Sequence, residues 1–499
     1  MRRRICFVLT AILLCGSSHA QDLPDASKFL PGPPETTSVH YIKDYLQYQW
    51  GKSLRDSTRG QQAVSDFNTE ISTYLTAYSK VLGTDLNSGM PKLNLLFEYC
   101  MNYGVRAQDQ AQKSYSYRRP YAQLNEQTLI PAYESTYRNI SSYPASQALF
   151  GWMYAMVLTE IAPNKQNEIL ARGYDFGASS VITGYHWDSD IYAGFLLASA
   201  LVSRLHTYPG FNGMVNAARA EYEQKMGIKN PIESASGDED VYFSYQELPD
   251  GYKYLPTPPV TISSFFACDL SAYEQGKAAR VDSNGNLTEE GQQALTDITY
   301  SADNFCKVFS PVFGKNLSAT ETPQLYKLLS KVHPSGNAAT QTCKAYYMRP
   351  RPYVQMNELT LYAPDEDHLR DTGSYPSGHA SGSWLHALVL AEINPDAEEA
   401  LLARAYLFGQ GRVISGYHWQ SDVDMGRLVA SAVYARLHTS KAFMEQLELA
   451  KQEFKGSTAV RSIATDGTDE APVYNLQGIR VETPSQPGIY IQGNKKVAY

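Results

Sequence analysis

The chain has 499 residues, of which 43% are hydrophobic, and this is enough for two sizeable cores in a globular protein. Lys and Arg number 43 against 51 Asp and Glu, which gives a formal net charge of −8 without a long basic run. That balance argues against nucleic acid as the main partner.

The first twenty residues have the pattern of a signal peptide. Three arginines at 2–4 precede an apolar stretch at 5–15, and Ser18-His19-Ala20 places small residues before a cut at Gln21. A lipoprotein would use Cys15, but the bulky Leu14 before it disfavours that alternative. No later stretch has the ~20 apolar residues of a membrane helix. We therefore expect a soluble, exported protein in the periplasm, at the cell surface or secreted.

Four cysteines remain after removal of the signal peptide: Cys100, Cys268, Cys306 and Cys343. In an oxidising compartment they can pair in three ways, and the sequence does not choose between them. Their wide spacing argues against a zinc knuckle.

Two long segments of the chain repeat each other. Residues 174–207 and 406–439 are identical at 20 of 34 positions without a gap, and both contain GYHW and end in RLHT. The same offset of 232 residues places RPYAQLNE at 119–126 over RPYVQMNE at 351–358. A repeat of this length is a duplicated domain and not a solenoid unit.

Both repeats have apolar residues at helical spacing, as in Ala380–Ile393 and Glu399–Phe408, with Gly and Pro clusters between them. We therefore expect an all-α protein of two tandem helical-bundle domains followed by a small β-rich C-terminal appendage. The predicted boundaries are a signal peptide at 1–20, a first repeat at 21–228, a linker at 229–250, a second repeat at 251–455 and a tail at 456–499.

The tail differs in composition from both repeats. Val473–Val481 and Gly488–Val497 are short β-like runs, and Gly493-Asn494 is a turn signal within the second. The text VYNLQGIRV…PGIYIQGNKKVAY resembles the C-terminal sorting domains of type IX secretion substrates. The alternative is a small β-rich appendage that does not act as a sorting signal.

Three segments of the second repeat carry the chemistry. In the first, Lys344 and Arg351 are seven residues apart, so two turns of one helix would place them on the same side. Arg412 adds a third cation, and such a cage suits a dianion because guanidinium matches phosphate oxygens.

The segments around the two histidines complete this pattern. Pro376-Ser377-Gly378 before an apolar run predicts a helix start, whose free N–H groups bind anions, with His379 at the same end. His418 and Asp422 are i, i+4 neighbours, so the carboxylate could hold one ring nitrogen and leave the other free to attack.

In this order the segments match the signature KxxxxxxRP…PSGH…SRxxxxxHxxxD of the type 2 phosphatidic acid phosphatase superfamily. Residues 254–440 most resemble the class A bacterial non-specific acid phosphatases, through YLPTPP, DLSAYEQGKAAR, GSYPSGH and GYHWQSDVD. The resemblance implies an all-α bundle around a phosphate pocket, without a cofactor or metal. Gly411 departs from the pattern, which has Ser there.

The resemblance also implies a role for each residue, with small phosphomonoesters as substrates. His418 would be the nucleophile, Asp422 would orient it, and His379 would serve as general acid and then as base. The phosphoryl oxygens would be held by the remaining site residues, Lys344, Arg351, Arg412, Ser377 and Gly378. The product of the first step would be a phosphohistidine.

The first repeat keeps the fold pattern but lacks part of this chemistry. Gln112, Gln147 and Ser180 stand where Lys344, His379 and Arg412 would be, and Ala145-Ser146 replaces Ser377-Gly378. Arg119, His186 and Asp190 remain. We expect this repeat to be non-catalytic, acting as an internal pseudo-subunit or as a weak anion site. The sequence does not decide whether the whole chain forms homo-oligomers.

Three other functions compete with this interpretation. Cys343 and Arg349 have the CxxxxxR spacing of cysteine phosphatases, but the bulky KAYYM between them lacks the glycines of a phosphate loop. A vanadate-dependent haloperoxidase would use the same cage, because vanadate mimics phosphate. A non-catalytic surface binding protein would not need the intact set of polar site residues.

Overall fold

The computed structural model describes residues 23–228 and 240–459, together with four strand segments between 473 and 498. The predicted signal peptide lies outside these residues, as do residues 229–239 of the predicted linker and the turn at Gly493-Asn494. None of the described helices is long and apolar enough to cross a membrane.

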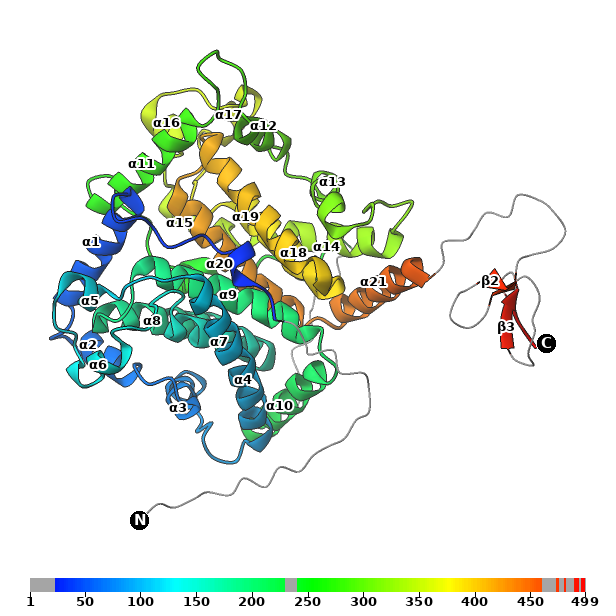
Figure 1. The fold of residues 1–499 in the computed structure, drawn as a ribbon, viewed down its shortest axis with the longest axis horizontal. Helices are drawn as coiled ribbons and strands as arrows, with labels where there is room; N and C mark the ends of the chain where they lie inside the picture. The colour runs from blue at the N-terminus through cyan, green and yellow to red at the C-terminus, as the bar shows by residue number, and fades with distance from the viewer. Residues whose placement is uncertain are drawn as a thin grey trace. The chain divides into compact units, whose positions relative to one another are not determined.

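The first repeat is helical throughout its described length (Figure 1). Its helices are α1 (Val39–Ser53), α2 (Thr58–Ser65), α3 (Ile71–Leu82), α4 (Pro91–Ser114), α5 (Pro120–Leu124), α6 (Glu134–Tyr137), α7 (Ser146–Ile161), α8 (Gln166–Thr183), α9 (Asp188–His206) and α10 (Phe211–Met226), with 3-10 turns at Ala26–Lys28, Pro131–Tyr133 and Pro163–Lys165.

The second repeat forms its helices in the same order. They are α11 (Ser264–Ala278), α12 (Glu289–Thr296), α13 (Ala302–Phe313), α14 (Pro323–Ala338), α15 (Gln341–Tyr347), α16 (Pro352–Met356), α17 (Glu366–Leu369), α18 (Gly378–Ile393), α19 (Glu398–Ile414), α20 (Gln420–Leu437) and α21 (Lys441–Ala459), with 3-10 turns at Gly251–Lys253, Ala363–Asp365 and Pro395–Ala397. The all-α prediction is confirmed for the two repeats.

One helix differs between the repeats. The first repeat has the unbroken α4, whereas the second divides the same stretch into α14 and α15. At the break, the Thr340 hydroxyl donates to the Asn337 carbonyl at 2.7 Å, and such a side-chain bond competes with the helical ladder. The break places Lys344 on α15, a helix separate from α14.

The two repeats form one compact unit, within residues 1–451. Its centre consists of α7–α9 and α18–α20, which lie side by side (Figure 1). The sequences of α7 and α18 are apolar on all faces, as expected of helices surrounded by protein, and nearly every residue in them is buried.

Side chains of the central helices join the repeats directly. Trp384 Nε1 donates to Ser199 Oγ at 3.1 Å, and Ser203 Oγ donates to the Leu388 carbonyl at 2.8 Å. Arg204 pairs with the fully buried Glu398 at 2.5 Å. The α18 helix, which carries the Ser377-Gly378-His379 motif at its start, is therefore packed against the first repeat.

The second unit, residues 452–499, contains a small antiparallel sheet. Its strands are β1 (Val473–Tyr474), β2 (Arg480–Val481), β3 (Ile489–Gln492) and β4 (Lys495–Ala498), in the spatial order β2-β1-β3-β4. Residues Gln492 and Lys495 face each other across the closing hairpin.

The sequence leaves the pairing of the cysteines open, and no disulfide joins the four that the structure describes. All four cysteines of the described chain are buried free thiols, on α4, α11, α13 and α15. Burial raises the pKa of the thiols, to about 12 for Cys306 and Cys343, so they stay protonated and behave as small core residues.

Candidate active site

His418 lies in the turn between α19 and α20, one residue before the N-cap Trp419. Gly416 makes this turn with a φ of 89°, and a Cβ there would lie 2.5 Å from the Arg280 guanidinium. The prediction that His418 and Asp422 share a helical face is therefore wrong, because the helix begins only after the histidine. Asp422 instead caps the helix, accepting the Trp419 N–H at 2.9 Å.

The turn nevertheless brings the two side chains together. Nδ1 of His418 is 3.4 Å from Oδ2 of Asp422, which is an ion-pair distance and longer than a good N–H···O bond. On the other side of the ring, Nη1 of Arg351 is 3.2 Å from Nε2. A guanidinium can only donate, so Nε2 is the lone-pair nitrogen and the proton is on Nδ1.

The electrostatics of the pocket keep this imidazole neutral. His418 is 2% exposed, and burial together with the charges of Arg351, Arg412 and Lys344 holds its pKa well below the ordinary value. A neutral ring with a free lone pair on Nε2 is the form that can attack an electrophile.

The cations reach the pocket from three separate elements. The prediction that Lys344 and Arg351 share one helix is wrong: α15 ends at Tyr347, Met348 is left-handed, and Arg351 is the N-cap of α16. The prolines at 350 and 352 prevent a continuous helix here. The two side chains still act on each other, since burial, followed by the charge of Arg351, lowers the pKa of Lys344.

Arg351 is held rigidly. It donates to the carbonyls of Leu369, Tyr417 and Gly373 at 3.1–3.3 Å and to the Thr372 hydroxyl at 3.0 Å. Lys344 is more open: its Nζ is 3.3 Å from Oδ1 of Asn337, at the end of α14. Burial, followed by the neighbouring arginine charges, lowers the pKa of Lys344 to about 7.

Arg412 is the most informative of the three cations. It is 1% exposed, and in the described part of the chain none of its three guanidinium nitrogens has a hydrogen-bond partner. The group stacks on the Tyr417 ring at 4.6 Å. Burial and the charge of Arg351 lower its pKa to about 9. A buried guanidinium with unsatisfied donors is costly and fits the binding of an anion.

The predicted helix start at Ser377 is confirmed. Ser377 is the N-cap of α18, and its hydroxyl accepts the Ala380 N–H at 3.3 Å. The first N–H groups of the helix, including those of Gly378 and His379, lack intrahelical partners. Gly378 is required by space, since a Cβ would lie 2.2 Å from Oδ1 of Asn337.

His379 is the second residue of α18 and is partly exposed. Its Nε2 lies 3.0 Å from the Ile298 carbonyl, which can only accept, so this nitrogen carries a proton. Nδ1 is then the nitrogen that can exchange a proton. Burial, followed by the charges of Arg412 and His418, holds the pKa of His379 well below its usual value.

Sequence reasoning missed two residues of the site, Asn337 and Arg349. Nothing in the three-part pattern marks Asn337, which contacts the lysine across the break between α14 and α15. The sequence marks Arg349 only as part of CxxxxxR, and that alternative fails because Cys343 is buried and Arg349 pairs with Asp269 and Asp422, each at 2.6 Å. Its difference from Tyr117 in the repeat alignment is the signal that could have found it.

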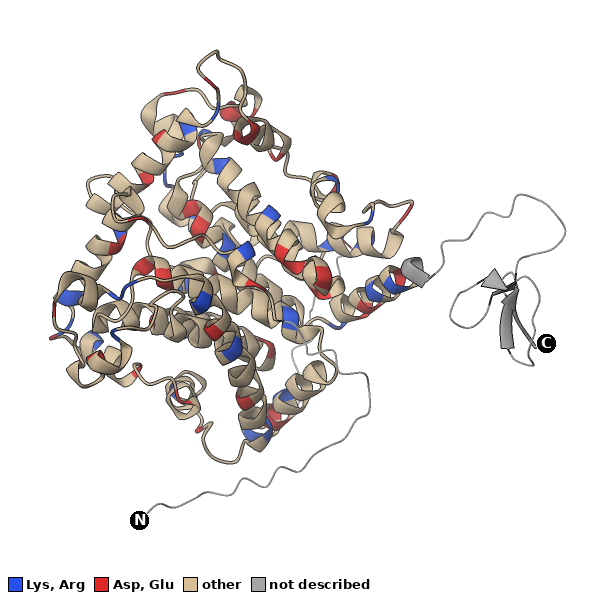
Figure 2. Ribbon diagram, viewed as in Figure 1, with Lys and Arg blue, Asp and Glu red and all other residues tan. Residues whose placement is uncertain are grey.

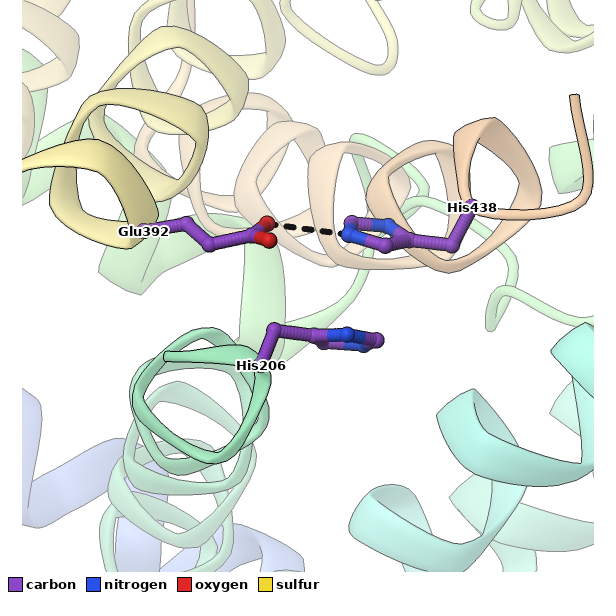
Figure 3. Close-up of side chains that lie close together, drawn as sticks. All are labelled: His206, Glu392 and His438. Atoms are coloured by element: carbon purple, nitrogen blue, oxygen red, sulfur yellow. Dashed lines mark hydrogen bonds and ion pairs between the residues drawn. The ribbon is translucent and has the colours of Figure 1, made fainter. Parts of the chain in front are cut away.

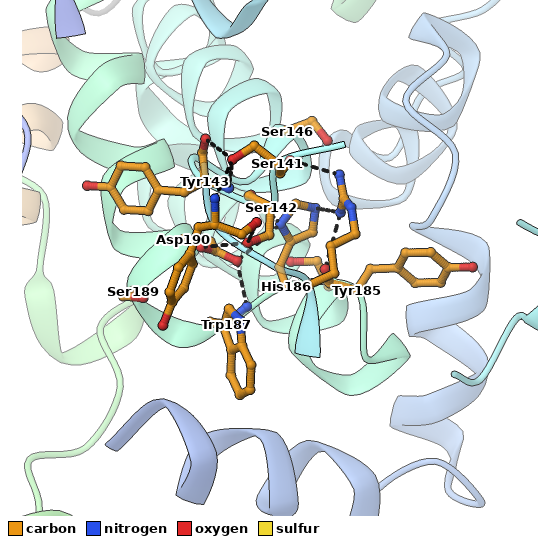
Figure 4. Close-up of polar contacts among 12 residues, drawn as sticks. Ser141, Ser142, Tyr143, Ser146, Tyr185, His186, Trp187, Ser189 and Asp190 are labelled. Atoms are coloured by element: carbon orange, nitrogen blue, oxygen red, sulfur yellow. Dashed lines mark hydrogen bonds and ion pairs between the residues drawn. The ribbon is translucent and has the colours of Figure 1, made fainter. Parts of the chain in front are cut away.

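The equivalent place in the first repeat is a closed polar network (Figure 4). His186 Nε2 is 3.1 Å from Nη1 of Arg119, and its Nδ1 is 2.8 Å from the Ser142 carbonyl. Gln147 donates to the Phe67 carbonyl at 3.0 Å, as His379 does to Ile298. Gln112 donates to the Ser141 carbonyl at 3.1 Å. Amides thus replace two of the ionisable groups, and Gln147 keeps the backbone contact that His379 makes in the second repeat.

A second histidine cluster joins the repeats at the far end of α9 and α20 (Figure 3). The rings of His206 and His438 stack at 3.9 Å. His206 Nε2 lies 3.0 Å from Glu160, and His438 Nε2 lies 2.9 Å from Glu392. Lys451 also donates to Glu392, at 2.7 Å. His206, Glu392 and His438 could hold a metal by composition. However, the stacked rings of His206 and His438 do not direct their nitrogens toward one ion, and the Lys451 ammonium beside Glu392 would repel a cation.

Comparison with known proteins places this site in a family. The model of the PAP2 superfamily matches residues 331–443, a segment that contains all eight predicted site residues. The chain is 41% identical to the non-specific acid phosphatase of Providencia stuartii over 214 residues, which is 43% of this chain and 84% of the relative. The chain belongs to the PAP2 superfamily, among the non-specific acid phosphatases.

Two further relatives, both acid phosphatases by name, match this chain over a similar length. The non-specific acid phosphatase of Salmonella typhi is 39% identical over 213 residues, 42% of this chain and 83% of the relative. The acid phosphatase of Zymomonas mobilis is 28% identical over 229 residues, 46% of this chain and 84% of the relative. Each match is about as long as one repeat, so the PAP2 relatives correspond to less than half of this chain.

Proposed function

We propose that the chain is an exported acid phosphatase that hydrolyses small phosphate monoesters through a phosphohistidine, with protein cations in place of a metal ion. The observation that carries this proposal is the neutral, buried His418, whose Nε2 lies 3.2 Å from Arg351 among three cations. Family membership and the names of the relatives support the same reaction.

In this mechanism the phosphoryl group binds between the cations. The fixed guanidinium of Arg351, the unsatisfied donors of Arg412 and the ammonium of Lys344 hold its oxygens. The Ser377 hydroxyl hydrogen and the N–H of Gly378 add donors at the start of α18, where the helix dipole also favours an anion. Phosphoryl transfer requires mainly such positioning and charge stabilisation.

Nε2 of His418 then attacks phosphorus, and the bond from phosphorus to the ester oxygen breaks. The leaving oxygen takes a proton from Nδ1 of His379, which the dianion helps to protonate because it offsets the nearby cations. In the second step His379 accepts a proton from water, the resulting hydroxide attacks the phosphohistidine, and inorganic phosphate and free His418 are released. Asp422 stabilises the charged ring during both steps.

The first repeat acts in this proposal as an internal, non-catalytic partner. It has Gln112, Gln147 and Ser180 at three positions of the site. In the second repeat these positions are the cation Lys344, the general acid His379 and the cation Arg412. Losing the general acid alone typically reduces the rate by ~10²–10⁴.

The matched pair of variants His418→Ala and His186→Ala tests the proposal, because the two histidines lie in nearly identical sequence. After dialysis against chelator, the wild type should hydrolyse a chromogenic phosphomonoester and vanadate should inhibit it competitively. His418→Ala should abolish turnover and trapping of labelled phosphoenzyme, whereas His186→Ala should keep kcat within a few-fold. A folded, inactive His186→Ala beside an active His418→Ala contradicts the assignment, and activity restored only by a divalent ion contradicts metal independence.

A further inference from the structure

Arg349 bridges two carboxylates behind the catalytic pocket. Its Nη2 pairs with Oδ2 of Asp269 on α11 and its Nη1 with Oδ1 of Asp422 on α20, both at 2.6 Å. Nη1 also donates to the Ser421 hydroxyl at 2.8 Å, and the guanidinium lies 5.6 Å from the centre of the Trp419 ring. The arginine is 6% exposed, so water screens these contacts little.

The two oxygens of Asp422 have separate partners. Oδ1 accepts from Arg349, while Oδ2 accepts the Trp419 N–H at 2.9 Å and faces Nδ1 of His418 at 3.4 Å. The arginine therefore fixes the rotation of the carboxylate and supplies its countercharge. A fully buried carboxyl without such a charge would tend to be neutral.

The first repeat contains the same arrangement without the arginine. Tyr117 stands at the position of Arg349, and Asp44 and Asp190 stand at those of Asp269 and Asp422. Burial raises the pKa of Asp190 to about 7 and that of Asp44 well above its usual value. Burial also raises the pKa of the Tyr117 phenol, so this side chain stays neutral and offers no countercharge.

We propose that Arg349 is a positioning residue of the phosphatase site, which keeps Asp422 ionised and turned toward Nδ1 of His418. This inference rests on the proposed function. When Nε2 attacks phosphorus, the ring becomes a cation that retains its Nδ1 proton, and an ionised Asp422 stabilises that cation. A protonated Asp422 would not. The change to Tyr117 is then a further loss in the first repeat, beyond the missing cations and acid.

The test uses Arg349→Gln and Arg349→Lys, with Arg172→Gln as the matched control. Arg172 also forms an ion pair with a buried carboxylate, that of Asp66 in the first repeat, and both of its Nη nitrogens donate there. Its loss should cost similar stability without touching the chemistry. Folding of each variant is verified by circular dichroism and thermal unfolding before the kinetics are measured.

Arg349→Gln should lower kcat by about 10–100-fold, as expected when a carboxylate that orients a histidine is disturbed. KM should stay within about three-fold, because the three phosphate-binding cations are intact. The acid limb of the kcat/KM profile should move toward neutral pH as Asp422 protonates, and Arg349→Lys should restore most of both properties. A normal acid limb in folded Arg349→Gln, or an equal loss of kcat in Arg172→Gln, overturns the proposal.

A measurement without substrate separates this inference from the proposed function. Infrared difference spectra over a pH titration detect a buried protonated carboxyl, and its band is assigned by comparison with Arg349→Gln/Asp422→Asn. The band should appear at higher pH in Arg349→Gln than in the wild type. If the band differs in this way between the two proteins but the wild type hydrolyses no phosphomonoester, the proposed function fails and the role of Arg349 stands. If the two titrate alike, the role of Arg349 is refuted.

Discussion

Phosphate binding should depend on the ionisation of Lys344. Its pKa in the free pocket is lowered to about 7, compared with an ordinary value near ~10.4. A dianion binds the ammonium form, so above this pKa the free protein must take up a proton when it binds substrate. The KM should therefore rise as the pH rises through neutrality, whereas a lysine of ordinary pKa would give no change before about pH 10.

The size of the effect follows from the fraction of protein in the competent form. With a pKa of about 7, that fraction is close to one at pH 6 and about 0.01 at pH 9, so KM should rise by about 10²-fold between them. Ionisation of the substrate contributes little above neutral pH, because the second pKa of a phosphate monoester is about 6.

The assay is the pH dependence of KM in the wild type and in Lys344→Arg, together with the inhibition constant of inorganic phosphate. Arginine stays charged over this range, so the variant should show a flat or much weaker rise, whatever its absolute KM. The phosphate inhibition constant of the wild type should follow KM. A wild-type KM that stays constant from pH 6 to 9, or an equal rise in the arginine variant, would refute the reasoning.

Two further effects concern the inter-repeat contact and the start of α18. Glu160 and Glu392 outweigh burial and raise the pKa of His206, so its stabilisation is complete below the unfolded value near ~6.5 and is lost as pH rises through the folded pKa. His206→Gln should therefore lower the melting temperature more at pH 5 than at pH 8, and an opposite trend counts against the ion pair. Gly378→Ala would place a Cβ 2.2 Å from Oδ1 of Asn337 and displace Lys344. We expect KM to rise about 10-fold, because the substrate loses one charge-assisted hydrogen bond of about 1.5 kcal/mol. A KM within two-fold of the wild type would show that the side chains around Gly378 adapt to the extra methyl group.

The candidate site residues can be found from sequence because the family pattern consists of residue types in a fixed order. Ser377 before Gly378 and an apolar run favours a helix start, since the hydroxyl can accept an N–H that the helix leaves free. The overall helical class follows in the same way from the spacing of apolar residues in stretches such as Ala380–Ile393.

The local geometry was less accessible, and the errors have physical reasons. The i, i+4 spacing would place His418 and Asp422 on one helical face. In the structure the Asp422 side chain accepts the Trp419 N–H and caps α20, so the helix begins only after His418. Lys344 and Arg351 meet across a left-handed residue and two prolines, which spacing alone does not describe. Contacts over long sequence separations, such as Arg349 with Asp269, have no local signal at all.

The distribution of charge also bears on partners. Figure 2 shows acidic and basic residues intermixed along the helices of the first unit in this view. Such mixing gives little long-range attraction for a polyanion, and it leaves the concentrated positive charge of the molecule inside the pocket.

The packing of α18 against α9 has a consequence for how the protein behaves on dilution. A helix that needs a neighbouring subunit for support loses it when the protein concentration falls below the dissociation constant of the assembly. Here the supporting surface is part of the same polypeptide, through contacts such as Ser203 with the Leu388 carbonyl and Trp384 with Ser199. Its local concentration is therefore fixed by the chain, and dilution of the protein does not remove this support from α18.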